Sequence, residues 1–222
     1  MVEQTVAEGA IILAGGPSSR MGEPKALVEV EGEAMLLWVV KALQIAGIPK
    51  AIISFKNQKQ ATTVIDALRQ KSQQWPPIIG EERLAMRMVF DDGLSQNQNS
   101  AVRGMNAAVT TAHQLGWKTV QVVPCDVPFI DPRLFSLLYS NLSSRGNCAV
   151  ALSQYGIEPL LFCANTEALN AAVNDMGLAA HEVISKMDSI EVGPTMWMAA
   201  GITNHCFTNV NSKEDLKSLN LF

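Results

Sequence analysis

The sequence predicts a single α/β domain that is built on a largely parallel sheet. Short apolar runs rich in β-branched residues alternate with stretches of helical periodicity along the whole chain. Polar clusters follow three of these runs, as expected where parallel strands end at one edge of a sheet. No internal repeat, low-complexity tract or linker interrupts the pattern, so residues 1–222 are expected to form one domain.

Composition and charge favour a soluble globular protein. Hydrophobic residues make up 48% of the chain, charged residues make up 17%, and the formal net charge is −4. No basic tract is interleaved with aromatic residues, so we do not expect nucleic acid as a partner. The chain shows no signal-peptide pattern and no apolar run of about 18 residues, so we expect neither secretion nor a membrane span. These features predict a cytoplasmic protein.

The first strand is predicted at residues 9–14, and the loop after it carries the most informative chemistry in the chain. Two adjacent glycines, Gly15 and Gly16, end the apolar run together with a proline and two serines. The loop then carries Arg20 and Lys25, and its glycines leave backbone N–H groups uncovered. This combination is suited to holding a polyphosphate from several sides. We therefore expect a nucleotide triphosphate to bind here.

The first half of the chain continues with alternating strands and helices. Residues 26–30 form a short alternating segment that turns at Glu31-Gly32. Residues 70–85 lose all periodicity and are predicted to be a peripheral loop or insertion. The predicted elements are a helix at 33–46 closed by Gly47, a strand at 51–55, a helix at 59–69, a strand at 86–90 and a helix at 101–114.

The second half begins with a strand at 119–123, whose apolar, β-branched residues suit a central strand covered on both faces. Asp131 and Pro132 are expected to be the N-cap and the first position of a helix. Ser212, with Asp215 three residues later, opens the terminal helix in a capping-box-like start. The remaining predicted elements are strands at 149–153 and 160–163, helices at 166–173 and 178–186, and a weak strand near 206–207.

Three polar clusters stand at the predicted ends of strands. They are the loop after residue 14, the pair Asp91-Asp92, and Asp126. Because ligands of open α/β sheets bind off the carboxyl ends of the strands, we expect these clusters to meet at one site. Asp131 is better placed than Asp126 to cap the next helix, which leaves the Asp126 carboxylate free to bind a metal ion.

The cysteines and histidines do not form a recognisable constellation. The absence of a C-x-x-C motif speaks against a zinc site or a disulfide scaffold, so we expect reduced cysteines that serve mainly in packing. We expect none of the scattered histidines to be catalytic. These residues are Cys125, Cys148, Cys163 and Cys206, and His113, His181 and His205.

The first loop does not match the common nucleotide-binding motifs. A Walker loop needs a lysine directly after its last glycine, whereas Glu23 follows Gly22 here, and the dinucleotide fingerprint is also absent. The arrangement L-A-G-G-x-S-S-R-M-G-x-x-K instead resembles the signature loop of sugar- and cofactor-nucleotidyltransferases, and in particular that of the molybdenum cofactor guanylyltransferases. The loop spans residues 13–25.

The resemblance extends over nearly the whole chain in the order of the family. Residues 125–128 (CDVP) reproduce its C-D-x-P turn after a central strand. Residues 209–211 (NVN) and 214–216 (EDL) reproduce its N-V-N turn and the helix that follows. Residues 158–160 (EPL) are a weaker echo of a Q-P-L-like turn. The resemblance implies a Rossmann-like three-layer sandwich of the nucleotide-diphospho-sugar transferase type.

The resemblance also implies roles for individual residues. Leu13, Ala14 and Gly15 would lie along the guanine nucleotide. Gly16, Ser18, Arg20 and Lys25 would hold its phosphates. Asp92, or Asp91 in its place, would lie near the nucleoside. Asp126 would bind Mg²⁺, and Asn209 and Asn211 would face the pterin acceptor; Arg20, Lys25 and Asp126 form the catalytic set.

The implied reaction transfers GMP from GTP to the phosphate of molybdopterin and releases pyrophosphate. An acceptor phosphate is already ionised at neutral pH, so the reaction needs charge neutralisation and positioning rather than a protein nucleophile or a general base. Two cationic side chains and a carboxylate-bound Mg²⁺ would supply these. The implied partners are GTP, molybdopterin and, transiently, molybdoenzymes or cofactor-synthesis proteins.

Two stretches depart from the guanine-specific pattern. Residues 99–104 (NSAVRG) stand where those enzymes have a G-P-L-x-G turn and are more similar to the S-V-x-x-G of cytidylyltransferases, and Arg103 offers a further phosphate or base contact. The double glycine of residues 15–16 favours GTP. The segment 195–201, with Trp197, is also less family-like. The alternatives are a cytidylyl- or sugar-phosphate nucleotidyltransferase and, in a different class, a non-catalytic nucleotide-sensing module.

Overall fold

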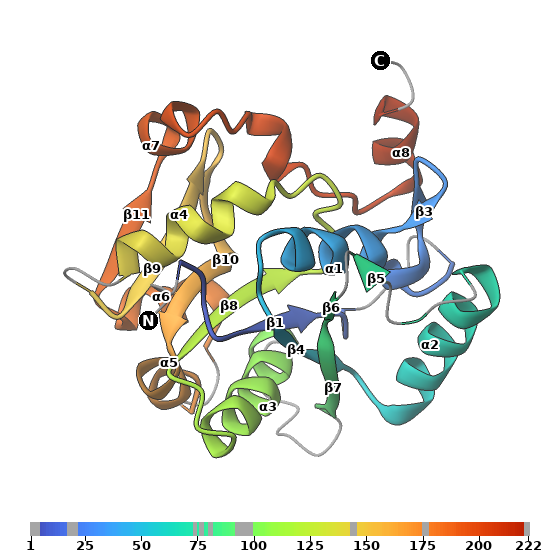
Figure 1. The fold of residues 1–222 in the computed structure, drawn as a ribbon, viewed down its shortest axis with the longest axis horizontal. Coiled ribbons are helices and arrows are strands. Elements are labelled where there is room, and N and C mark those ends of the chain that lie inside the picture. The colour runs from blue at the N-terminus through green and yellow to red at the C-terminus, as the bar shows by residue number, and fades with distance from the viewer. Residues whose placement is uncertain are drawn as a thin grey trace.

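The computed structural model describes residues 5–16, 22–72, 75, 78–79, 82–91, 100–142, 146–174 and 178–219. Its centre is a seven-stranded sheet with the order β11-β9-β10-β8-β1-β4-β7 (Figure 1). Strand β10 runs antiparallel to both of its neighbours, and the other strand pairs of this sheet are parallel. The strands are β1 (Gly9–Leu13), β4 (Lys50–Phe55), β7 (Ala85–Phe90), β8 (Thr119–Pro124), β9 (Cys148–Ser153), β10 (Gly156–Asn165) and β11 (Ser189–Val192).

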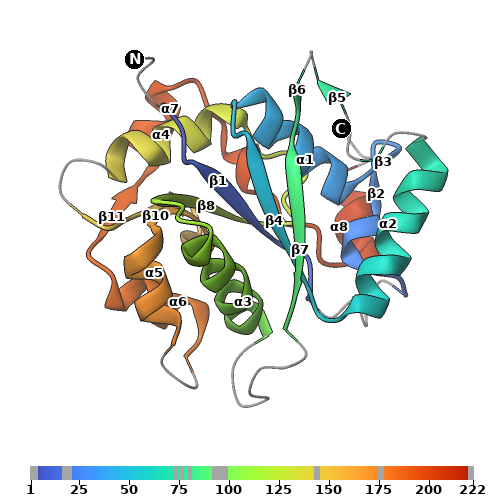
Figure 2. The same ribbon diagram turned by 60° about the horizontal axis from the view of Figure 1, so that its bottom comes forward.

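Helices cover both faces of this sheet, which gives three layers (Figure 2). The β1 side chains of Ala10 and Ile12 pack with the first group of helices, and those of Ile11 and Leu13 pack with the second group. A strand covered on both faces is apolar throughout, which explains the continuous run of β1. The first group is α1 (Met35–Ile45), α2 (Gln58–Ser72), α4 (Pro132–Leu142) and α7 (Pro194–Ala199); the second is α3 (Ser100–Gln114), α5 (Thr166–Val173) and α6 (Ala180–Lys186).

The strand order reverses between β1 and β8. The chain steps outward from β1 to β4 and β7, and then returns to place β8 on the other side of β1. In the register of the sheet, Leu13 at the end of β1 lies opposite Pro124 of β8 and Ser54 of β4. The chain segments after β1 and β8 therefore leave the sheet side by side. Such a switch point is where open α/β sheets bind their ligands.

A small cluster of side chains attaches the C-terminal segment to the edge of the fold. Val210 is fully buried beside Val30 and Met35, and Leu216 of the last helix packs against the same cluster. The short strands of this region turn through Glu31 and Gly32, both with positive φ, as a two-residue hairpin of the primed type requires. The elements involved are the 3-10 helix η1 (Lys25–Leu27), β2 (Glu29–Val30), β3 (Glu33–Ala34) and α8 (Lys213–Leu219).

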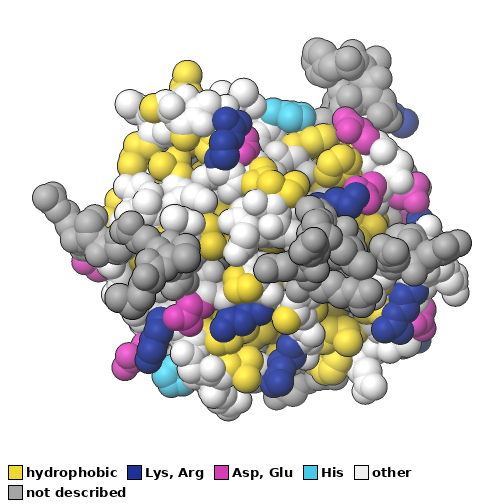
Figure 3. Space-filling view, viewed as in Figure 1, with side chains coloured by type: hydrophobic (Ala, Val, Ile, Leu, Met, Phe, Trp, Pro, Cys, Tyr) yellow, Lys and Arg dark blue, Asp and Glu magenta, His cyan; other side chains and the backbone are white. Residues whose placement is uncertain are grey.

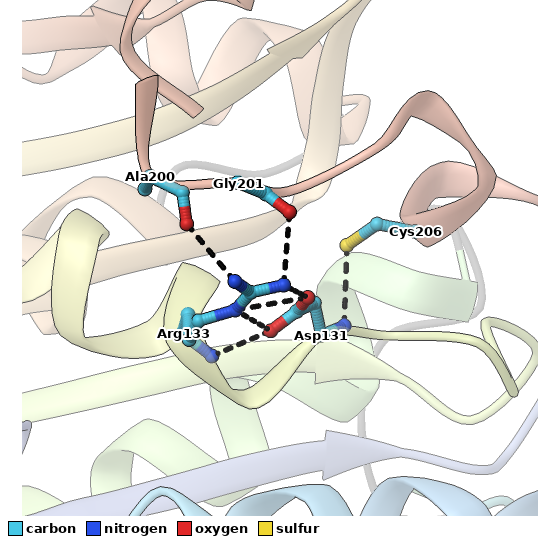
Figure 4. A network of polar contacts seen from close by, with 5 residues as sticks. All are labelled: Asp131, Arg133, Ala200, Gly201 and Cys206. Atoms are coloured by element: carbon cyan, nitrogen blue, oxygen red, sulfur yellow. Dashed lines mark hydrogen bonds and ion pairs between the residues drawn. The ribbon is translucent and has the colours of Figure 1, made fainter. Parts of the chain in front are cut away.

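A polar network holds the segment after α7 against the start of α4 (Figure 4). The Asp131 carboxylate accepts a hydrogen bond from the backbone N–H of Arg133 at 2.9 Å, so Asp131 is the predicted N-cap. The Arg133 guanidinium also pairs with this carboxylate, and it donates to the carbonyls of Ala200 and Gly201 at the end of α7. The backbone N–H of Asp131 lies 3.3 Å from Cys206 Sγ.

The structure corrects several predicted elements. The helix expected over 33–46 begins at Met35, because residues 33–34 pair with residues 29–30. In the stretch 70–85, predicted as a peripheral loop or insertion, the described residues include the end of α2 and the paired short strands β5 (Ile78–Ile79) and β6 (Glu82–Arg83), and whether the stretch is an insertion stays a prediction. The weak strand expected near 206–207 is wrong, since these residues end the 3-10 helix η2 (Asn204–Phe207). Strand β11 and helix α7 were not predicted.

The described residues also bear on the predicted cysteines and on membrane insertion. All four cysteines are buried and free, and burial raises the pKa of Cys148 and of Cys206 to about 12. No helix in the described part of the chain has the length and apolar character needed to cross a bilayer.

On the face seen in Figure 3, basic side chains are interspersed with acidic and apolar ones.

Candidate functional site

A cavity of about 170 Å³ opens where β1, β4 and β8 end and α3 begins. We call it the strand-end cavity. Its walls combine the backbone of the first loop with apolar side chains, a lysine and an aspartate. They are formed by Leu13, Gly15, Gly16, Lys25, Ser54, Ala101, Gly104, Pro124, Cys125, Asp126 and Leu160.

A second cavity, of about 240 Å³, lies between the loop after β8, the first residues of β10 and the C-terminal turn. We call it the C-terminal cavity. It is formed by Pro124, Asp126, Val127, Glu158, Pro159, Leu160, Leu161, Phe207, Asn209 and Asn211. Pro124, Asp126 and Leu160 line both cavities. The two cavities are therefore adjacent, with the Asp126 carboxylate at their junction.

Backbone hydrogen bonds set the loops around the junction. The N–H of Cys125 donates to the Leu13 carbonyl at 3.1 Å, and the N–H of Val210 donates to the Asp126 carbonyl at 3.0 Å. A side chain at Gly15 would approach the backbone N of Lys56 to 2.9 Å, so only glycine fits without a shift of the main chain. The first loop, the β8 turn and the C-terminal turn are thus positioned against one another.

Three polar side chains from these segments meet at the junction. Lys25 Nζ of η1 lies 2.8 Å from Asp126 Oδ2, and it also donates a hydrogen bond to Asn211 Oδ1. The side chains of Lys25 and Asp126 are each 18% exposed, which leaves both within reach of a ligand. A bound polyphosphate could form ion pairs with the lysine in place of Asp126, and a bound cation could be coordinated by the carboxylate in place of Lys25.

The cap of the last helix holds Asn211 in place. Asp215 Oδ2 accepts hydrogen bonds from the backbone N–H of Asn211 at 2.7 Å and from that of Ser212 at 2.9 Å. Ser212 Oγ in turn accepts a hydrogen bond from the N–H of Asp215 at 3.2 Å. This is the reciprocal arrangement of a capping box, as predicted for Ser212 and Asp215. The turn that carries Asn209 and Asn211 is therefore tied to the start of α8.

Of the two aspartates after β7, the structure describes Asp91. Asp91 is buried, and its Oδ2 lies 3.8 Å from Arg103 Nε in the first turn of α3. Arg103 therefore faces a carboxylate and, like Asp91, does not line either cavity. Asp92 lies outside the described residues.

The other predicted residues are distributed over the two cavities. Leu13, Gly15, Gly16 and Lys25 line the strand-end cavity, whereas Asn209 and Asn211 line the C-terminal cavity. Ala14 lies in the same loop with its side chain buried, and its N–H donates to the Ser54 carbonyl at 2.9 Å. Ser18 and Arg20 lie outside the described residues. Their roles, like those of the residues in the cavities, stay predictions.

Sequence reasoning missed Ser54 and undervalued Glu158. Ser54 is the second-last residue of β4 and is 1% exposed. Its hydroxyl has no hydrogen-bond partner among the described residues, although it lines the strand-end cavity. A polar residue between the apolar residues at the end of this strand was the available signal. Glu158 belongs to the weak Q-P-L-like echo of residues 158–160, to which no site role was given, yet it lines the C-terminal cavity.

The described walls of both cavities offer little for covalent or acid–base catalysis. Cys125 is buried beside Asp126, and burial together with this carboxylate raises the pKa of its thiol, so it is no ready nucleophile. The three histidines are exposed, and none of them lines either cavity. What the described residues provide is backbone N–H groups, a lysine, two carboxylates and amides, a set suited to binding and orienting a phosphate-bearing ligand and its cation.

A lysine and a carboxylate beside glycine-rich backbone at the switch point of an α/β sheet are typical of proteins that bind nucleotides. The chain belongs to the family of the MobA-like NTP transferase domain, whose model matches residues 10–190. The protein is therefore an enzyme of the nucleotidyltransferase kind. The predicted family and the predicted fold class are confirmed.

A curated relative agrees with this assignment, and solved structures share the fold. The molybdenum cofactor guanylyltransferase of Rhizobium meliloti (strain 1021) is 29% identical over 220 residues, which cover 94% of this chain and 88% of that protein. A molybdopterin-guanine dinucleotide biosynthesis protein A from Archaeoglobus fulgidus superposes with a TM-score of 0.69 at 17% identity, covering 95% of this chain and 96% of that one.

A third comparison concerns a metal complex. A protein from Mycobacterium tuberculosis H37Rv, solved in complex with manganese, superposes with a TM-score of 0.62 at 13% identity and covers 95% of this chain and 96% of that one. At this identity the likeness shows a shared fold.

Proposed function

We propose that this enzyme transfers GMP from GTP to the phosphate of molybdopterin and releases pyrophosphate. The observation that carries the proposal is the cluster of Lys25, Asp126 and Asn211 at the junction of two cavities. A transfer between two substrates needs a donor site and an acceptor site that share the reacting phosphates. The strand-end cavity suits the donor, and the C-terminal cavity suits the acceptor.

The donor side rests on the loop after β1. Gly15 and Gly16 bring backbone against the cavity, and Leu13 and Ser54 line its inner wall. In this proposal the base and ribose lie along residues 13–15, with Asp92 near the nucleoside, and Ser18, Arg20 and Lys25 hold the phosphates. Lys25 exchanges its contacts with Asp126 and Asn211 for the oxygens of the triphosphate.

The chemistry of the junction fits a divalent cation that is held mainly by substrate. Among the described residues, no group of three or more histidines, cysteines and carboxylates could form a metal cage. Mg²⁺ is commonly bound by one or two carboxylates together with phosphate oxygens, and Asp126 supplies such a carboxylate. When bound there, Mg²⁺ would neutralise phosphate charge and polarise the α-phosphate. The manganese complex of the structural neighbour supports a divalent metal in this fold.

The chain's own residues then act by position and charge. Lys25 stabilises the negative charge that gathers on the leaving pyrophosphate, and Asp126 keeps the donor and acceptor phosphates in reach of each other. Asn209 and Asn211 orient the acceptor so that its phosphate oxygen faces the α-phosphorus. No proton has to be removed, because that oxygen is already ionised.

Substrate panels with purified protein test the proposal. We expect pyrophosphate release with Mg²⁺, molybdopterin and GTP, and a loss of at least about 100-fold in kcat/KM for Asp126→Asn and for Lys25→Ala. Glu191→Gln, an exposed substitution on β11, serves as the matched control. Turnover that depends on CTP or on a sugar phosphate instead of GTP and molybdopterin would overturn the assignment.

A cytidylyl- or sugar-phosphate transfer is the second candidate. The stretch 99–104 favours it, because Gly104 and Ala101 line the strand-end cavity where the guanine-specific turn would stand. The same substrate panel decides between the two reactions.

We propose the cytoplasm as the place of the reaction, because GTP is available there, and molybdoenzymes or cofactor-synthesis proteins as the recipients of the product. Contact with those enzymes would be transient. Nucleic acid and membranes have no part in the proposal.

A further inference from the structure

Glu158 lines the C-terminal cavity, and the proposed reaction assigns it no role. It lies near the start of β10 and is half-buried, and within the described residues no hydrogen bond or ion pair holds its carboxylate. A carboxylate on a cavity wall that accepts no hydrogen bond from the protein can accept hydrogen bonds from a ligand. Glu158 is therefore a candidate for direct contact with a bound acceptor.

Strand β10 is irregular where it passes the C-terminal cavity. Residues 158–161 all line this cavity, and the pairing of β10 with β9 shifts register between Ile157 and Phe162. Bulges of this kind commonly redirect side chains beside active sites.

The position of Glu158 relative to the junction defines which part of an acceptor it meets. Leu160 lines both cavities, whereas Glu158 lines only the C-terminal cavity and not the strand-end cavity. Two residues along a strand span about 7 Å. If the acceptor phosphate lies at Asp126, as the proposed function requires, Glu158 faces the portion of the acceptor that is remote from the phosphate.

The walls between these two points indicate the shape of that portion. Val127, Pro159, Leu161 and Phe207 give the cavity apolar surfaces, which suit a flat ring better than a sugar with many hydroxyl groups. The polar side chains of this cavity differ in the hydrogen-bonding groups that they can recognise on a ligand. The amides of Asn209 and Asn211 both donate and accept hydrogen bonds, whereas an ionised glutamate only accepts them.

We propose that Glu158 is a specificity-determining residue that accepts two hydrogen bonds from a heteroaromatic ring carrying an exocyclic amino group next to a ring N–H. The two carboxylate oxygens match such a pair of parallel donors. A carbonyl oxygen or a second anion at the same place would face the carboxylate and be rejected. This inference rests on the proposed function for the direction in which the acceptor lies.

Two fluorescent probes without a phosphate test the role of Glu158. 6-Hydroxymethylpterin carries the amino group and the ring N–H side by side, and 6-hydroxymethyllumazine has a carbonyl oxygen in place of the amino group. We expect the wild-type protein to bind the pterin at least about tenfold more tightly than the lumazine. In Glu158→Gln this preference should fall to near unity, because a glutamine amide can also donate to the carbonyl.

Two further variants separate recognition from packing. Glu158→Asp keeps an acceptor-only group and should keep the preference at lower affinity, and the exposed Glu191→Gln should behave as wild type. Binding of Mg·GTP, measured on the same samples, reports whether the donor side is intact. A pterin-to-lumazine ratio that is unchanged in Glu158→Gln, or no pterin binding by the wild type, would overturn the inference. Selective pterin binding without GTP-dependent turnover would instead refute the proposed function alone.

Discussion

At the scale of single residues, the site depends on contacts between side chains that are far apart in the sequence. Lys25 belongs to the first loop, Asp126 follows β8, and Asn211 belongs to the C-terminal turn, yet the three meet at one point. Motif spacing could indicate each of them separately. It could not show that Lys25 and Asp126 neutralise each other before substrate arrives, because that depends on the packing of the whole domain.

Replacement of Asn211 by alanine should separate the lysine from the C-terminal turn. Lys25 would keep Asp126 as a partner and lose the amide oxygen that orients it. In the proposed reaction Asn211 also orients the acceptor phosphate, and a hydrogen bond to a charged group contributes about 1.5–3 kcal/mol, so we expect kcat/KM to fall by about 10- to 100-fold while the fold is retained. Steady-state kinetics with circular dichroism as a folding check measure this. Asn174→Ala on the exposed end of α5 is the control, and equal activity of both variants would contradict the role of Asn211.

Ser54 shows how much of the site was hidden from the sequence. Its hydroxyl points into the space beside Gly104, and a Cβ at Gly104 would come within 2.8 Å of Ser54 Oγ. The L-A-G-G motif, the C-D-x-P turn and the N-V-N turn were visible because they form local patterns. Ser54 and Glu158 gain their meaning from strand pairing and from a bulge, which a single sequence does not reveal.

At the scale of elements, the close approach of α3 to β4 shapes the wall of the strand-end cavity. Gly104→Ala should destabilise the protein, because the new methyl group would press on the Ser54 hydroxyl. In a Ser54→Ala background the nearest β4 atom would be Cβ at 3.6 Å, an ordinary van der Waals contact, so the destabilisation should largely disappear. A double-mutant cycle by urea denaturation tests the coupling. Additive effects of the two substitutions would show that the contact is not responsible.

The polar network at the start of α4 should make the free energy of unfolding depend on pH in the acidic range. Hydrogen bonds from Arg133, opposed in part by burial, lower the pKa of the Asp131 carboxyl below its ordinary value. A carboxyl with a lowered folded-state pKa stabilises the fold at pH values above its unfolded pKa, near 3.8, and loses this effect as the pH falls through the folded pKa.

Asp131→Asn should therefore destabilise the protein by a small and constant amount between about pH 5 and pH 7, because asparagine still caps the helix and only the charge of the contact with exposed Arg133 is lost. The difference from wild type should shrink as the pH falls below about 4. Urea denaturation at several pH values measures it. Asp66→Asn, at an exposed position, is the control, and a gap between Asp131→Asn and wild type that widens toward low pH would contradict the argument.

The elements that could be predicted are those with strong local signals. Strands β1, β4 and β8 are apolar and β-branched, and α4 and α8 carry recognisable caps. Strand β11 and helix α7 have weaker patterns, because much of their surface is half-buried or exposed and their positions depend on Arg133 and on β9. Residues 206–207 were mistaken for a strand because two buried apolar side chains look alike in a strand and in a 3-10 turn.

At the scale of the whole molecule, donor binding should couple the first loop, the β8 turn and the C-terminal segment. A ligand at 100 times its Kd stabilises the folded state by about 2.7 kcal/mol. For a domain of this size, that corresponds to a rise in Tm of about 5–10 °C for Mg·GTP. Thermal denaturation with GTP, CTP and ATP in Mg²⁺ checks the expectation. The rise should be much smaller in Asp126→Asn, and an equal rise for that variant would argue against its part in binding the metal nucleotide.

The antiparallel direction of β10 has a consequence for how this architecture can diversify. Because β10 runs against β8, its first residues lie at the sheet edge where β1 and β8 end, next to a short connection from β9. Substitutions and insertions there would change the acceptor without touching the loop that holds the triphosphate. The same catalytic half could thus serve a succession of acceptors during evolution, with the hairpin of β9 and β10 as the exchangeable part.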